Sequence, residues 1–160
     1  HSYDMPVLAL RFFNVFGPLQ PPLHTYAAVI PAFLSAAMQG QPLPVHGDGT
    51  QCRDFTYVDT VVAVIVDAIQ RRVSHLEPLN LAFGQKITLL EVISELEVIM
   101  DHNLSVDFQP SRVGDVARSQ ADSSALKRKF PDITPSNFAH GLRATADWFR
   151  STRPWDQGVD

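Results

Sequence analysis

Polar side chains that suit phosphate or sugar binding follow an apolar strand near the start of the chain. Residues 8–18 read LALRFFNVFGP, so the strand ends abruptly at an aromatic pair, Asn14 and a Gly-Pro turn. In parallel α/β sheets, ligands bind just beyond the carboxyl ends of the strands. Asn14 can therefore donate to a phosphate or a sugar while the aromatic rings cover a flat group. The alternative is a buried strand followed by a turn.

Two arginines stand in connections where an anion can be held. Arg53 follows the turn at residues 47–49, and Arg112 is followed closely by Asp115 in a second loop. A guanidinium binds phosphate through two parallel hydrogen bonds, which Lys cannot supply, and an Asp can accept from a pair of ribose hydroxyls. Together they would hold a nucleotide. The alternatives are a surface pair between Arg53 and Asp54, and a loop salt bridge worth little.

The composition is that of an ordinary globular chain. Its 160 residues make about one domain, with 45% hydrophobic and 19% charged residues and a net charge of −4. This charge argues against nucleic acid as a partner, and the basic triplet at 127–129 is interpreted as a solvated helix face. Cys52 is the single cysteine, so neither a disulfide framework nor a zinc site is expected. No stretch suggests a signal peptide or a membrane partner, and we expect a cytoplasmic setting.

The order of the expected elements predicts an α/β fold. Val7 to Leu10 is apolar on both faces, as in a central parallel strand. Helix 59–72, for which Asp59 is the expected N-cap, is too apolar for an exposed helix. The other expected elements are a helix that starts near Pro31 and stops at Gly40, strands at 44–46, 53–58, 79–82 and 105–108, a helix after the capping-box pair Thr88 and Glu91, and helices at 123–130 and 137–150.

The first strand comes almost at once, and few parallel partners follow it. We therefore expect the chain to be the C-terminal part of a longer protein, with an apolar sheet edge left without partners.

The chain resembles the C-terminal half of the extended short-chain dehydrogenase/reductase family, and within it the sugar-nucleotide epimerases and dehydratases of the UDP-glucose 4-epimerase type. The resemblance covers nearly the whole chain and implies NAD as cofactor, a UDP-sugar as substrate and a homodimeric parent protein. The matching motifs are LRFFNVFGP (10–18), YAAVIP (26–31), GDGTQCRDFTYVD (47–59), GDVARSQAD (114–122) and GLRATADWF (141–149).

The same resemblance implies a domain organisation. Residues 1–18 would be the last part of a Rossmann-type NAD-binding domain. Residues 19–160 would form mainly the small α/β domain that binds the nucleotide-sugar, with residues 53–84 returning to the Rossmann sheet.

The resemblance also implies roles around the diphosphate. Phe13 would pack near the nicotinamide, and Asn14 would hydrogen-bond to the diphosphate. Arg53 and Arg112 would neutralise the diphosphate from two sides, and Asp115 would hold the ribose.

Five further positions would contact the nucleotide or the sugar. Ala28 and Val29 would line the nucleotide site, while Val45 and His46 would present backbone groups to the uracil edge. The alternative for His46 is a half-buried ring without a chemical role. Ser119 would lie beside the sugar, where a small residue leaves room for an N-acetyl group; the alternative is a serine that starts a turn.

The departures from the family pattern concern catalysis. The chain has no glycine-rich NAD fingerprint and no Tyr-x-x-x-Lys pair, since neither Tyr3 nor Tyr26 has Lys four positions later. No catalytic residue is therefore expected, and the chain alone should be inactive. The expected role is the nucleotide-sugar-binding half of an NAD-dependent UDP-hexose 4-epimerase that accepts UDP-N-acetylhexosamines. The alternatives are a dehydratase or decarboxylase of the same family, and a stand-alone non-catalytic nucleotide-sugar-binding module.

Overall fold

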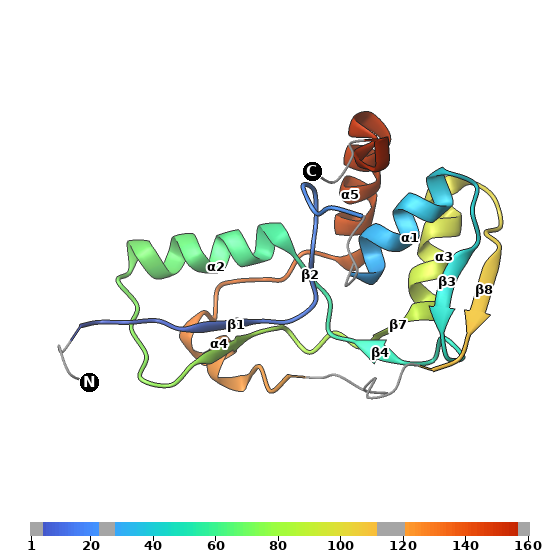
Figure 1. Cartoon of the computed structure of the whole chain (residues 1–160). Helices are drawn as coiled ribbons and strands as arrows, with labels where there is room; N and C mark the ends of the chain where they lie inside the picture. Colours follow the sequence, from blue (N-terminus) through green and yellow to red (C-terminus); the bar gives the residue numbers. More distant parts are fainter. Residues whose placement is uncertain (1–4, 23–27, 112–120, 157–160) are drawn as a thin grey trace.

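The computed structural model of the chain describes residues 5–22, 28–111 and 121–156. Within these ranges, short strands alternate with helices along the chain (Figure 1). The elements are β1 (Leu10–Phe12), β2 (Val15–Phe16), α1 (Val29–Met38), β3 (Leu43–His46), β4 (Cys52–Arg53), β5 (Thr56–Tyr57), α2 (Val58–Gln70), β6 (Leu79–Leu81), β7 (Ile87–Thr88), α3 (Leu89–Met100), β8 (Val106–Gln109), α4 (Ser124–Lys129), α5 (Phe138–Thr152) and a 3-10 turn (Pro154–Asp156).

The strands of the described ranges associate in pairs. β1 pairs with β6, β2 with β5 and β3 with β8, all in parallel, and β4 pairs with β7 in antiparallel. Parallel partners need a long crossover between them, and here helices lie in those crossovers. The expectation of an α/β fold with parallel strands is confirmed.

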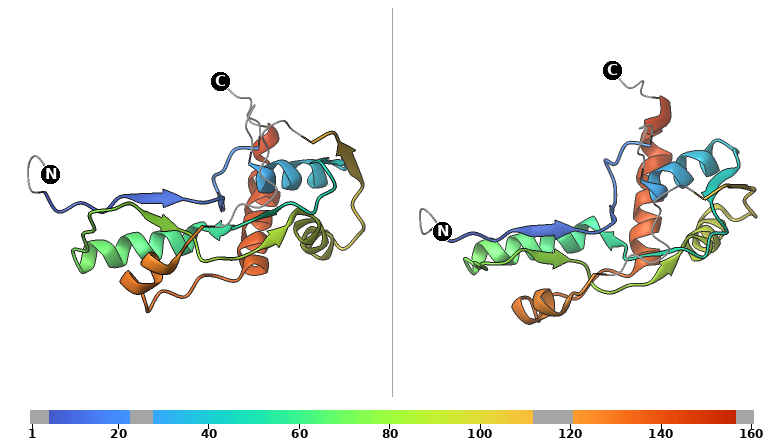
Figure 2. Two further views of the ribbon diagram at one scale, coloured as in Figure 1. Left: turned by 90° about the horizontal axis from the view of Figure 1, so that it is seen from below. Right: turned by 60° about the horizontal axis from the view of Figure 1, so that its bottom comes forward.

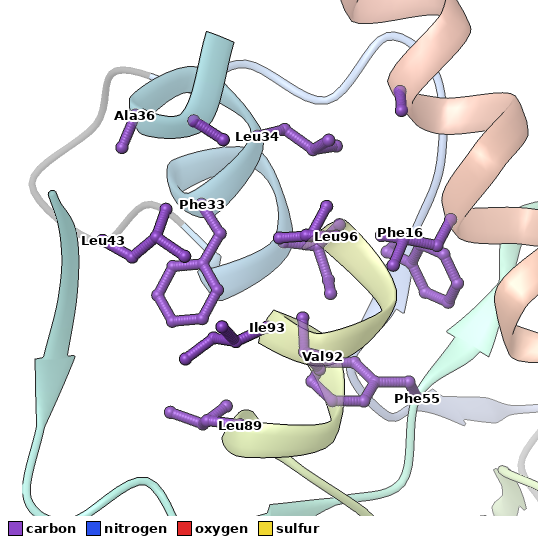
Figure 3. Close-up of a cluster of buried hydrophobic side chains, with 14 of the residues drawn as sticks. Phe16, Phe33, Leu34, Ala36, Leu43, Phe55, Leu89, Val92, Ile93 and Leu96 are labelled. Carbon is purple, nitrogen blue, oxygen red and sulfur yellow. The ribbon is translucent and has the colours of Figure 1, made fainter. Parts of the chain in front are cut away.

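One hydrophobic cluster joins three helices to β3 and to the strands β2 and β5. Figure 3 shows side chains of α1 and α3 meeting Leu43 of β3 and, on the other side, Phe16 and Phe55. Phe33, Leu34 and Leu96 are almost completely withdrawn from water, and a buried side chain of this size contributes roughly 1.5–3 kcal/mol. We call this the first cluster.

A second cluster lies around the β1–β6 pair. Figures 1 and 2 show β1, α2 and α4 at one end of an elongated molecule, with α1, α3, β3 and β8 at the other. Partly buried Leu8 and Leu10 pack against this cluster, and its buried members come from α2, β6, α4 and their flanks: Val61, Val64, Ala68, Leu79, Leu81, Phe83, Leu126 and Phe130. The assignment of residues 1–18 and 53–84 to a Rossmann-type sheet stays a prediction.

The outer surfaces of β1 and α2, around the second cluster, carry exposed apolar side chains. Within the described ranges β1 has a strand partner on one edge only, and Val7 and Phe12 are 53% and 59% exposed. The expected covering of the first strand on both faces is therefore not seen. α2 buries one face on the second cluster and exposes an apolar stripe at helical spacing, formed by Val62, Ile65, Val66 and Ile69.

Local signals located most element ends within a few residues. The capping box is confirmed: the Glu91 backbone N–H donates to Thr88 Oγ1 (3.1 Å), and the Thr88 N–H donates to Glu91 Oε2 (2.6 Å). Asp59 is not the N-cap of α2. Tyr57 takes that position, and Asp59 lies in the first turn, where a negative charge is favourable.

Candidate functional site

The expected strand over residues 53–58 is in fact two strands with a bend between them. β4 pairs with β7, with Arg53 opposite Ile87, whereas β5 pairs with β2, with Thr56 opposite Val15. The chain changes partner at Asp54. The bend brings the Arg53–Asp54 dipeptide to the end of β1, where Asn14 lies.

Asn14 occupies the break between β1 and β2 in an unusual backbone conformation. Its φ is +36°, a region that Asn tolerates better than most residues because its short polar side chain bonds locally. The side-chain Nδ2 donates to the Asp54 carbonyl (3.3 Å), and the Asn14 carbonyl accepts from the Thr56 N–H (3.3 Å). An amide nitrogen carries two hydrogens, and Asn14 is exposed.

Asp54 is fully buried, which overturns the alternative of an Arg53–Asp54 surface pair. Its Oδ2 accepts from the Gly84 N–H (2.9 Å) and its Oδ1 from the Gln85 N–H (3.1 Å). Burial raises the pKa of this carboxyl above its usual value, and backbone N–H groups, chiefly those of Gly84 and Gln85, oppose the rise. The burial of Asp54 could not be predicted from the sequence, because its position after Arg53 fits a surface pair equally well.

Arg53 precedes this buried aspartate in the chain and is half-buried at the end of β4. Its Nη1 donates to the Cys52 carbonyl (2.9 Å). A guanidinium carries five N–H donors in a planar fork, a geometry that matches phosphate.

Val45 and His46 lie at the end of β3, opposite Phe108 and Gln109 of β8. Val45 is completely buried in the first cluster, so it can offer a ligand only its backbone. The His46 carbonyl accepts from Gln51 Nε2, and His46 Nδ1 lies 3.4 Å from the Pro110 carbonyl. The ring is half-buried, as in the alternative without a chemical role.

The turn between β3 and β4 is held by its own side chains. Asp48 Oδ1 accepts from the hydroxyl (2.7 Å) and from the backbone N–H (2.9 Å) of Thr50, and these bonds lower the pKa of Asp48. Gly47 and Gly49 have φ values of +84° and +79°, which only glycine adopts readily. This hydrogen-bonded turn connects His46, at the end of β3, to Arg53 on β4.

The first helix contributes its amino terminus. Ala28 is the exposed N-cap of α1, and Val29 is its half-buried first residue. No side chain caps the first turn, and it contains no acidic residue, so its backbone N–H groups favour a negative charge. Phe13, which precedes Asn14, is half-buried.

The structure brings Asn14 and the Arg53–Asp54 bend together and joins Val45 and His46 to that bend through a fixed turn. Arg112, Asp115 and Ser119 lie outside the described residues. No group of His, Cys, Asp and Glu side chains in the described ranges could hold a metal ion. The helices of those ranges are also too short or too polar to cross a bilayer.

The alternation of helices with parallel strand pairs makes this chain part of a Rossmann-type α/β fold. The model of the NAD dependent epimerase/dehydratase family matches residues 1–82. The chain belongs to this family.

Two curated relatives are each 31% identical to the chain. They are a dTDP-glucose 4,6-dehydratase of Xanthomonas campestris pv. campestris (strain B100; 170 residues, 99% of this chain and 47% of the relative) and a UDP-N-acetyl-alpha-D-glucosaminuronate decarboxylase of Bacillus cytotoxicus (152 residues, 91% and 47%). The chain spans about half the length of these relatives.

A solved structure shares the fold closely. It is the UDP-N-acetylglucosamine 4-epimerase from Methanobrevibacter ruminantium M1 in complex with UDP-N-acetylmuramic acid, with a TM-score of 0.84 and 34% identity over 94% of this chain and 48% of that one. These similarities confirm the resemblance to sugar-nucleotide epimerases and dehydratases, and they confirm a Rossmann-type α/β fold.

Proposed function

We propose that this chain is the nucleotide-sugar-binding half of an NAD-dependent UDP-hexose 4-epimerase. The observation that carries the proposal is the hydrogen bond from the exposed Asn14 side chain to the Asp54 carbonyl, which joins Asn14 to the Arg53–Asp54 dipeptide. An amide and a guanidinium from different strands suit the two phosphates of a sugar nucleotide. Arg112 would complete the charge neutralisation, and Asp115 would bind the ribose.

The remaining site residues would contact the nucleotide and the sugar. Ala28 and Val29 line the nucleotide at the start of α1, and the backbones of Val45 and His46 face the base. Ser119 leaves space at the sugar, so that UDP-N-acetylhexosamines are accepted besides plain UDP-hexoses. Support for this sugar class comes from the similarity to a UDP-N-acetylglucosamine 4-epimerase in complex with UDP-N-acetylmuramic acid.

Catalysis and cofactor binding need more than these residues supply. Phe13 offers one wall for the nicotinamide of NAD, and NAD supplies hydride transfer when bound. No tyrosine of the sequence is followed by Lys at the fourth position, so the acid/base pair of the family is absent and the chain alone is inactive. The parent enzyme is a homodimer whose interface lies largely outside this chain.

A second reaction within the same family is a 4,6-dehydratase or a decarboxylase, which the similarity to one enzyme of each kind favours. The third candidate is a stand-alone, non-catalytic nucleotide-sugar-binding module. All three share the nucleotide-sugar site, so binding is tested first.

The test is calorimetric titration of the folded 160-residue chain with UDP, then with UDP-glucose and UDP-N-acetylglucosamine. Hydrogen bonds to a charged group contribute about 1.5–3 kcal/mol, so Arg53→Ala and Arg112→Ala should each weaken UDP binding roughly ten- to hundredfold. Arg150→Ala is the matched control, because Arg150 is exposed on α5 and pairs with Asp147. Absence of UDP binding by a folded chain, or equal weakening by the control, would refute the proposal.

A further inference from the structure

Asp54 lies where the chain passes between the two hydrophobic clusters. Phe55, its neighbour, is buried in the first cluster, while Phe83 is buried in the second. The segment at residues 84–86 then leads from β6 to β7, back toward the first cluster. The Asp54 carboxylate bonds to Gly84 and Gln85 in that segment. It therefore ties two passages of the chain at the boundary between the clusters.

The backbone carbonyl of Asp54 bonds to a third segment of the chain. The Asp54 carbonyl accepts from Asn14 Nδ2 (3.3 Å), and Asn14 is the residue at which the chain turns from β1 into β2. One residue thus joins the passages at 14, 54 and 84–85, which are far apart in the sequence. A displacement of Asp54 would move all three.

Because the Asp54 carboxylate is buried, its hydrogen bonds should be sensitive to replacement of a single atom. A buried carboxylate is costly unless it is hydrogen-bonded, and hydrogen bonds to an ionised acceptor are about twice as strong as neutral ones. Both carboxylate oxygens accept from a backbone N–H. An Asn at this position would offer one oxygen and one NH2 group, and the NH2 group would face a backbone donor instead of an acceptor.

We propose that Asp54 is a positioning residue that fixes Asn14 and Arg53 at the spacing at which both reach one diphosphate. Arg53 precedes Asp54 in the chain, and Asn14 is one hydrogen bond away from its carbonyl. Asp54 itself is fully buried and acts on the ligand only through these two neighbours. The inference rests on the proposed nucleotide-sugar site and adds a residue to it for which the family resemblance gave no role.

A merely structural aspartate would stabilise the fold without affecting the affinity of the folded chain. The test therefore compares UDP affinity, measured by calorimetry at a temperature at which circular dichroism shows each variant to be folded. Asp54→Asn should raise the dissociation constant for UDP at least tenfold. Leu96→Ala, which removes a fully buried side chain of the first cluster, should destabilise the chain but leave that constant within twofold.

The outcomes separate the two proposals. If the wild-type chain binds UDP and Asp54→Asn binds it equally well, the positioning role is wrong and the proposed function stands. If the folded wild-type chain binds no UDP, the proposed function fails and this inference fails with it.

A second measurement decides the matter even if Asp54→Asn does not fold. In the nitrogen–proton correlation spectrum of the wild-type chain, the amide signals of Gly84 and Gln85 should move when UDP saturates the site, because the Asp54 carboxylate accepts from both. Unmoved amide signals at saturating UDP would overturn the positioning role.

Discussion

Replacing Gly141 with Ala would place a methyl group inside a space already filled by Tyr57. Gly141 lies near the start of α5, and a Cβ there would come within 2.6 Å of Tyr57 Cγ, 2.7 Å of Cδ2 and 2.9 Å of Cβ. These atoms lie at the root of the side chain and cannot swing aside. The ring itself is held by Phe16 at a centroid distance of 5.6 Å and by His140 at 6.3 Å. Either α5 or β5 must therefore move.

Two opposing effects set the size of the change. Overpacking a tight site costs typically about 1–3 kcal/mol, and three contacts below 3.0 Å place Gly141→Ala at the upper end of that range. Ala is better than Gly within a helix by about 1 kcal/mol. The net loss in free energy of unfolding is about 2 kcal/mol, which for a chain of this size lowers the melting temperature by about 4–8 °C.

The assay is thermal and urea unfolding of the wild-type chain and Gly141→Ala, followed by circular dichroism. The matched control repeats the substitution in a Tyr57→Ala background, where the obstructing ring is gone and only the helix preference remains. There Gly141→Ala should stabilise the chain by about 1 kcal/mol. An unchanged or raised melting temperature in the wild-type background, or the same loss in both backgrounds, would refute the steric reasoning.

Two further predictions concern the cap and the core of the first cluster. Thr88→Ala should cost about 1 kcal/mol in urea unfolding at neutral pH. Hydrogen bonds from Thr88 lower the pKa of Glu91 in the folded chain. The Glu91 carboxylate therefore stabilises the fold at pH values above the pKa that Glu91 has in the unfolded chain. This stabilisation is lost as the pH falls through the pKa of Glu91 in the folded chain. The destabilisation by Glu91→Gln should shrink over that interval, and a loss independent of pH would contradict the cap. Leu96→Ala should lower the free energy of unfolding by about 2–5 kcal/mol. Val98→Ala, at a 65% exposed position of the same helix, should change it by no more than about 0.5 kcal/mol. Equal losses in the two variants would contradict the assigned core face.

Local signals in the sequence were enough for the order of the helices and of β3, β6 and β8. The Thr88–Glu91 pair is three residues apart, so a capping box can be identified without knowledge of the rest of the fold. The short apolar run at 79–82 and the pattern at 44–46 likewise located β6 and β3. The motifs around Asn14 and Arg53 also carried the resemblance to the family, which the match over residues 1–82 confirmed.

The tertiary structure alone decided what these residues do to one another. The sequence predicts one strand over 53–58, but two different partners, β7 and β2, divide it at Asp54. Burial of that aspartate depends on the Gly84 and Gln85 amides, about thirty positions further along the chain. The outward stripe of α2 is exposed for a similar reason, since packing against the second cluster determines which apolar face is buried. Periodicity and caps depend on neighbours within a few residues. The hydrogen-bond partners that position Asp54 and Asn14 come together only when distant segments of the chain pack.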